Sequence, residues 1–207
     1  MSLVLHFTPV IFHKKSGVSI PKRTNGTNFA IQFLRDDQQH IMATVIESLC
    51  SWVHQDAFVP LRMTVSGVAG SGKSTLIQTI VSTVRSIFRR NDVIHVCVPT
   101  GSAAFHAGGE TIHRLFQIRV NGISETLTST KSKSLKSKFS NLVVLIVDER
   151  SILQSELLGV MEAYSRQTVH YGLNHSKPWG NIPIILLVGD SYHLSPIHKG
   201  AFDSLID

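Results

Sequence analysis

Two hydrophobic patterns alternate along this chain. Apolar residues at helical spacing, or short apolar segments, predict helices over Asp36–Trp52, Thr75–Ile87, Thr111–Phe116 and Ser151–Ser165. Short, mostly apolar runs predict buried strands over Leu61–Ser66, Val93–Val98, Leu142–Val147 and Ile182–Val188. Strands that alternate with helices indicate an α/β fold: a mostly parallel sheet with right-handed crossovers and helices on both faces.

The first 32 residues show no sustained period and contain Gly17, Pro21 and Gly26. We expect a loosely structured leader there, with a short strand near Leu3–Phe7, followed by one domain over residues 33–207. A length of 207 residues suffices for one α/β domain with its own core. We expect no membrane span, because no apolar run approaches bilayer length.

Composition adds charge and redox information. The net charge of +6 favours a polyanionic partner, although a nucleotide alone would also explain a basic cleft. Cys50 and Cys97 lie in apolar stretches, which predicts buried, reduced thiols without a disulfide or a zinc site. Four lysines stand among serines in Ser129–Lys138. We favour a solvated loop or helix face for this segment over a patch that contacts phosphates.

A glycine-rich motif in the chain indicates a phosphate-binding loop. Residues Gly67–Thr75 read GVAGSGKST, which satisfies G-x-x-x-x-G-K-[ST] between a predicted strand and a predicted helix. In such a loop, backbone N–H groups and a helix N-terminus face a triphosphate. Lys73 would reach the outer phosphates and the Ser74 hydroxyl would ligate Mg²⁺. The alternative is a Gly/Ser-rich turn before a helix, which the strand–loop–helix context disfavours.

Acidic residues follow two of the predicted strands. Asp148 and Glu149 come directly after Leu142–Val147, at the carboxyl edge where an open α/β sheet binds its ligand. Asp148 would hold the metal and Glu149 would orient and deprotonate the attacking water. Without the phosphate loop, we would interpret the two as an ordinary acidic pair. Gly189-Asp190 follows the last strand and fits a group that senses the γ-phosphate, but Gly-Asp also makes a common turn.

These motifs occur in an order that resembles a known family. The blocks are Asp37-Gln38, GVAGSGKST, PTGSAAFHAGGETIHRLF (Pro99–Phe116), LIVDERSIL (Leu145–Leu153) and LLVGDSYHLSP (Leu186–Pro196). The order is similar to that of the petite-integration-frequency (Pif) DNA helicases of superfamily one, which are related to RecD. The Pro99–Phe116 block is the most discriminating, and the resemblance extends from Phe33 to the end of the sequence. It implies a RecA-like P-loop NTPase domain.

The resemblance also implies roles for individual residues. Gln38 would read the adenine edge, so that ATP is the expected fuel and Mg²⁺ the expected metal. The phosphate and metal site would comprise Gly67, Gly70, Ser71, Gly72, Lys73, Ser74, Thr75, Asp148 and Glu149, with Asp190 and His193 sensing the γ-phosphate. Single-stranded or forked DNA would pass along Thr100, Gly101, Phe105, Gly108, Gly109, Thr111 and His113. Phe105 is equally compatible with core packing, and backbone charge and base stacking would dominate the grip on DNA.

Three departures from the family pattern qualify these expectations. His193 and Ser195 replace a glutamine and a proline in the third motif. In the family this glutamine links the γ-phosphate state to the binding of DNA, and histidine differs from it in reach and charge, so the coupling is in question. Arg150 replaces an apolar residue and needs a partner or solvent. We also expect the second RecA-like domain, with its γ-phosphate-contacting arginines, to be absent from these 207 residues. Hydrolysis by this chain alone would then be slow.

The expected function is therefore the N-terminal motor domain of a 5'-3' ATP-dependent DNA helicase. The alternative is a degenerate, nucleotide-dependent module that binds single-stranded DNA without unwinding. A small-molecule P-loop kinase is disfavoured by Glu149 and by the Pro99–Phe116 block. The resemblance further implies work in DNA repair, recombination or telomere maintenance, in the nucleus or mitochondrion of a eukaryote.

Overall fold

The computed structural model describes residues 4–7, 34–54, 58–101, 104, 108–119, 127–169 and 177–190. For residues 4–7 it describes the backbone alone. Phe105, His193 and Ser195 lie outside the described residues, as does most of the predicted leader. The short strand expected near Leu3–Phe7 is present at Val4–Phe7.

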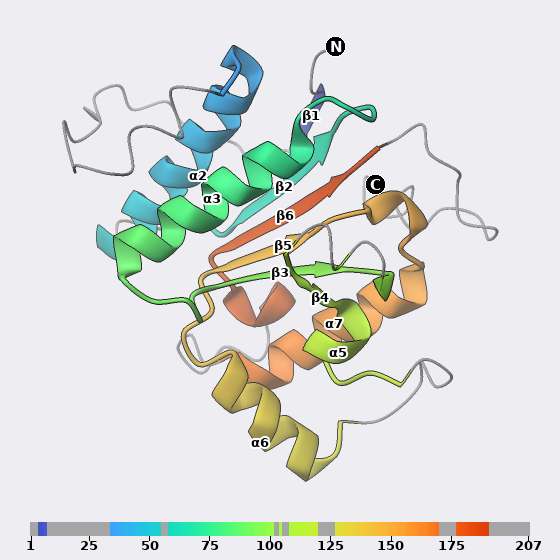
Figure 1. Cartoon of the computed structure of the whole chain (residues 1–207). Coiled ribbons are helices and arrows are strands. Elements are labelled where there is room, and N and C mark those ends of the chain that lie inside the picture. The colour runs from blue at the N-terminus through green and yellow to red at the C-terminus, as the bar shows by residue number, and fades with distance from the viewer. Residues whose placement is uncertain are drawn as a thin grey trace.

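A six-stranded sheet in the order β1-β2-β6-β5-β3-β4 forms the centre of the fold (Figure 1). Its strands are β1 (Val4–Phe7), β2 (Leu61–Ser66), β3 (Ile94–Val98), β4 (Glu110–Thr111), β5 (Val144–Val147) and β6 (Ile184–Gly189). All neighbouring pairs are parallel except β1 with β2, which is antiparallel. The predicted, mostly parallel sheet is confirmed. All of β5 is buried, as its unbroken apolar run predicts.

Helices cover both faces of the sheet, as predicted (Figure 1). On one face, α2 (Asp36–His54) and α3 (Lys73–Phe88) bury their apolar sides in one core cluster. On the other, α5 (Ile112–Leu115), α6 (Ser129–Lys138) and α7 (Ser155–Thr168) contribute to a second cluster. Two short 3-10 segments, η1 (Arg150–Ile152) and η2 (Pro178–Asn181), lie beside β6 and α7. The sheet therefore separates two cores.

Several element boundaries differ from the predictions. The helix expected from Ser151 begins at Ser155, because Glu149 adopts a left-handed backbone and a 3-10 turn follows it. Strand β4 was not predicted, since two residues show no period. Cys97 is buried as expected, but Cys50 is only half-buried, because it follows the buried Leu49 on the flank of α2.

The lysine-rich segment forms helix α6 with a solvated face. Leu135 is the buried residue of this helix, and Lys133 is exposed. Lys138 is not a free cation, because its ammonium lies 3.0 Å from a carboxylate oxygen of Glu110. The segment is therefore a helix, and its exposure to solvent in preference to phosphate contact stays a prediction. Among the described residues, no helix is both long and apolar enough to cross a bilayer.

Candidate nucleotide-binding site

The polar residues singled out above meet at the carboxyl ends of neighbouring strands. Ser66, the last residue of β2, pairs with Gly189 in β6, and the N–H of Gly67 donates to the Gly189 carbonyl at 3.1 Å. On the far side of β6, Asp148 follows β5, and its N–H donates to the Cys97 carbonyl of β3 at 2.9 Å. The phosphate loop and the acidic pair thus lie on either side of the central strand β6, at the carboxyl ends of the parallel strands.

The phosphate loop has the backbone that its glycines predict. Gly70 and Gly72 have φ angles of +75° and +80°, a region that glycine enters at little cost. The Lys73 ammonium donates to the carbonyl oxygens of Gly67 and Val68 at 2.5 and 3.0 Å. Helix α3 begins at Lys73, so its N-terminal amides and their partial positive charge lie directly behind the loop.

The acidic pair occupies two different environments. Asp148 is half-buried, and its Oδ1 accepts the N–H of Glu149 at 2.8 Å. Burial raises the pKa of the Asp148 carboxyl, and the positive charge of Lys73 acts in the opposite direction. Glu149 is exposed and has a φ of +58°, a sparsely populated conformation for a non-glycine residue. Because of this turn, the two adjacent carboxyl groups have different surroundings: that of Asp148 is half-buried and that of Glu149 is exposed.

Arg150, which departs from the family pattern, has a partner in the structure. Its Nη2 donates to the Ser66 hydroxyl at 2.7 Å, which links the turn after β5 to the end of β2. Burial lowers the pKa of this guanidinium. A Cβ built on Gly189 would lie 2.8 Å from the Arg150 side chain and 2.9 Å from its backbone nitrogen. Gly189 therefore permits the close approach of Arg150 to β6.

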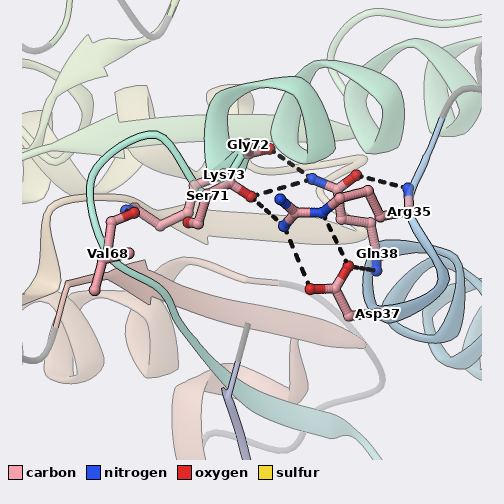
Figure 2. A network of polar contacts seen from close by, with 7 residues as sticks. All are labelled: Arg35, Asp37, Gln38, Val68, Ser71, Gly72 and Lys73. Carbon is pink, nitrogen blue, oxygen red and sulfur yellow. Dashed lines mark hydrogen bonds and ion pairs between the residues drawn. The ribbon is translucent and has the colours of Figure 1, made fainter. Parts of the chain in front are cut away.

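Gln38 and Arg35 contact the phosphate loop directly (Figure 2). The buried Gln38 side chain donates from Nε2 to the Gly72 carbonyl at 3.0 Å, and its Oε1 accepts the N–H of Arg35 at 3.0 Å. The Arg35 guanidinium donates to the Ser71 carbonyl at 2.5 Å. No sequence motif points to Arg35, because its contact with residue 71 is a tertiary one.

The oxygen donors present at the site fit a magnesium ion. The Ser74 hydroxyl is exposed in the first turn of α3. The preceding residue, Lys73, interacts electrostatically with the Asp148 carboxyl. Magnesium takes hard oxygen ligands, usually one or two carboxylates together with phosphate oxygens.

Ser71 Oγ is buried and has no hydrogen-bond partner among the described residues. Asp190 is also buried, one residue beyond β6.

The residues expected along a DNA path lie at the end of β3 and around β4. Thr100, Gly101 and Gly108 are exposed. Thr111 and His113 are half-buried and make local contacts: the Thr111 hydroxyl accepts the Arg114 N–H at 3.2 Å, and His113 Nδ1 lies 3.2 Å from the Ile118 carbonyl oxygen.

Gly109 has a packing role that the sequence did not reveal. A Cβ there would lie 2.5 Å from the Val96 carbonyl oxygen, so the glycine allows the chain to reach β3 and pair with it.

Comparison with known proteins assigns the family. A model of the PIF1-like helicase family matches residues 33–206. The chain belongs to the PIF1-like helicase family. It is 34% identical over 137 residues to the ATP-dependent DNA helicase PIF1 of Saccharomyces cerevisiae, covering 65% of this chain and 15% of that protein. It is 36% identical over 127 residues to the helicase PIF4 of Trypanosoma brucei brucei, covering 59% of this chain and 15% of that protein.

Solved structures of this family share the fold. The Pif1 helicase of Candida albicans superimposes with a TM-score of 0.62 at 25% identity, over 81% of this chain and 34% of that chain. Bacteroides Pif1 in complex with ADP-AlF3 and single-stranded DNA gives a TM-score of 0.57 at 27% identity, over 84% of this chain and 36% of that chain. This PIF1-like chain therefore spans about a third of the length of these solved chains, and less of the curated relatives.

Proposed function

We propose that this chain is the N-terminal motor domain of an ATP-dependent DNA helicase that hydrolyses ATP to move 5'-3' along single-stranded DNA and to unwind duplex. One observation carries the proposal: the phosphate loop and Asp148-Glu149 flank β6 at one edge of the sheet in a chain of the PIF1-like family. The relatives are named ATP-dependent DNA helicases, and one solved relative holds ADP-AlF3 and single-stranded DNA.

The residues of the site divide the chemistry of ATP hydrolysis among them. The loop amides and Lys73 bind the phosphates, and the ammonium leaves the Gly67 and Val68 carbonyls to reach the outer phosphate oxygens. Ser74 and Asp148 would hold Mg²⁺, which neutralises charge on the outer phosphates when it is bound. Glu149 orients the attacking water and accepts its proton, a role that suits an exposed carboxylate on a tight turn. Asp190 and His193 would sense the γ-phosphate.

DNA would lie across the exposed end of β3, along Thr100, Gly101 and the segment from Gly108 to His113, including Gly109 and Thr111. The net charge of +6 supports a polyanionic partner. A solved Bacteroides relative is in complex with single-stranded DNA, and another solved Pif1 structure concerns DNA unwinding at forked double-stranded DNA. Phe105 would offer a stacking face to the bases. The whole protein would act in repair, recombination or telomere maintenance, in the nucleus or mitochondrion of a eukaryote.

A second RecA-like domain would supply the arginines that complete catalysis. An arginine of this kind raises phosphoryl-transfer rates by roughly 10³ to 10⁵ in related systems. These 207 residues by themselves should therefore bind ATP and hydrolyse it slowly. The alternative function, a DNA-binding module that does not unwind, is favoured by His193 and Ser195 in place of a glutamine and a proline in the third motif.

The test measures ATP turnover and single-strand affinity of the purified chain. Weak ATP hydrolysis that single-stranded DNA stimulates, with DNA affinity that falls steeply as salt rises, supports the motor assignment. ATP binding with a flat salt response would contradict the proposed backbone contacts with DNA. Failure to bind ATP would contradict both the motor and the alternative module.

A further inference from the structure

Two residues at the start of α2, Arg35 and Gln38, donate hydrogen bonds to backbone carbonyls of the phosphate loop. Arg35 Nη2 donates to the Ser71 carbonyl at 2.5 Å, and Gln38 Nε2 donates to the carbonyls of Gly72 and Ser71 at 3.0 and 3.5 Å (Figure 2). Asp37 grips the same guanidinium through two bonds of 3.3 Å. We propose that Arg35 and Gln38 are positioning residues, which orient the loop amides that bind the triphosphate. This inference rests on the proposed function, since it concerns the same triphosphate site.

Peptide geometry explains how bonds to carbonyl oxygens can orient N–H groups. In a planar trans peptide, the C=O and the N–H point in opposite directions. The Ser71 carbonyl shares its plane with the Gly72 N–H, and the Gly72 carbonyl shares its plane with the Lys73 N–H. Drawing the Ser71 oxygen toward the start of α2 therefore directs the Gly72 N–H to the opposite side. The Gly72 oxygen also accepts the Leu76 N–H at 3.0 Å, so Gln38 and α3 together orient the Lys73 N–H. A cationic donor such as Arg35 also polarises the peptide and strengthens its N–H as a donor.

The loop needs such external support because of its glycines. Gly70 and Gly72 both have positive φ angles, and glycine loses more conformational freedom on ordering than any other residue. Contacts that order the loop before ligand arrives reduce the entropy lost when the phosphates bind. Arg35 and Gln38 lie more than thirty residues upstream of the loop, at the start of α2, so they supply these contacts from outside the loop and the helix that follows it.

Gln38 consequently has two roles: it would contact the adenine base, and it hydrogen-bonds to the phosphate loop. Gln38 Nε2 lies within hydrogen-bond distance of two loop carbonyls, and the 3.5 Å contact with Ser71 is the weaker one. If Gln38 reads adenine as the family resemblance implies, the base takes the hydrogen of this weaker contact and the bond to Gly72 persists. Gln38 then acts on phosphate binding even for a ligand that has no base.

The test compares ATP with inorganic tripolyphosphate, which has no base, by calorimetric titration in the presence of Mg²⁺. Arg35→Ala should weaken the binding of both ligands by about tenfold, the size expected for one charge-assisted hydrogen bond at a half-exposed site. Gln38→Ala should weaken tripolyphosphate binding by about fivefold and ATP binding by more. Arg90→Ala is the matched control, because Arg90 forms a similar pair with Asp92 in the turn after α3. It should change neither affinity.

Asp37→Asn separates positioning from simple attraction of charge. If Arg35 only attracted phosphates through space, removing the nearby negative charge would tighten triphosphate binding. If Asp37 holds the guanidinium against the Ser71 carbonyl, the same change should weaken binding by about threefold. Arg35→Lys keeps the charge and loses the two-bond fork with Asp37, so it should rescue the Arg35→Ala loss only in part.

Thermal unfolding of each variant shows whether the fold is kept. The Arg35 side chain is 45% exposed, so its replacement tests the idea even if the buried Gln38 variant is destabilised. Folded Arg35 and Gln38 variants that bind tripolyphosphate as tightly as the unaltered chain would overturn the positioning role and leave the proposed function standing. An unaltered chain that binds neither ligand would overturn both.

Discussion

Replacing Gly72 by alanine perturbs the phosphate loop in two separable ways. The residue has a φ of +80°, and its new Cβ would lie 2.5 Å from Gln38 Nε2, inside the sum of the atomic radii. Gly70 has a similar φ of +75°, but a Cβ there meets no atom within 4 Å. Gly70→Ala is therefore a matched control, which carries the backbone cost without the collision.

The magnitudes follow from these two contributions. An alanine in the left-handed region costs about 1–2 kcal/mol at either position. At Gly72 the Gln38 amide must also move, which breaks its 3.0 Å bond to the Gly72 carbonyl and costs about 1 kcal/mol more. Gly72→Ala should thus lower the free energy of unfolding by about 2–3 kcal/mol, against about 1–2 kcal/mol for Gly70→Ala.

Urea denaturation without nucleotide measures both effects, because a ligand would add its own contribution. A double-mutant cycle then tests the cause: in a Gln38→Ala background, Gly72→Ala should cost no more than Gly70→Ala. Equal destabilisation by the two glycine variants in the unaltered chain would refute the contact between Gln38 and the loop.

Further predictions concern the rest of the site. Lys73→Ala should abolish ATP binding in calorimetry, and unchanged affinity would end the phosphate-loop assignment. Glu149→Gln should bind ATP normally but lose its turnover in a phosphate-release assay; unaltered turnover would remove Glu149 from the mechanism. Gly109→Ala should lower the free energy of unfolding by about 1–3 kcal/mol, because its Cβ meets the Val96 carbonyl; a neutral effect on urea denaturation would contradict that packing. Because burial raises the pKa of Asp148, the folded state binds its proton more tightly, so this carboxyl stabilises the fold below its ordinary pKa of 3.8 and loses that contribution as pH rises. Asp148→Asn should therefore be more stable than the unaltered chain at pH 7 but not at pH 3, as urea denaturation at each pH would show.

Much of the fold could be predicted because single elements carry their own signal. The helical spacing of Ile41, Met42, Val45 and Leu49 predicts α2, and all four residues are buried. The apolar run before Asp148 predicts a strand covered on both faces, which β5 is. The limits of prediction appear where the signal is short or depends on backbone geometry. Strand β4 has two residues, and the left-handed Glu149 delays the start of α7.

The chemical character of this protein follows from local patterns of residues. The phosphate loop, the acidic pair and the order of the motifs are local patterns, and strand–loop–helix context places each at the same edge of a parallel sheet. The distant side chains that support these motifs become visible only in the folded chain. Arg35 reaches the Ser71 carbonyl, Arg150 reaches the Ser66 hydroxyl, and Gly109 fits beneath Val96. These contacts join residues far apart in the chain, so they depend on how helices and strands pack, which no local spacing encodes.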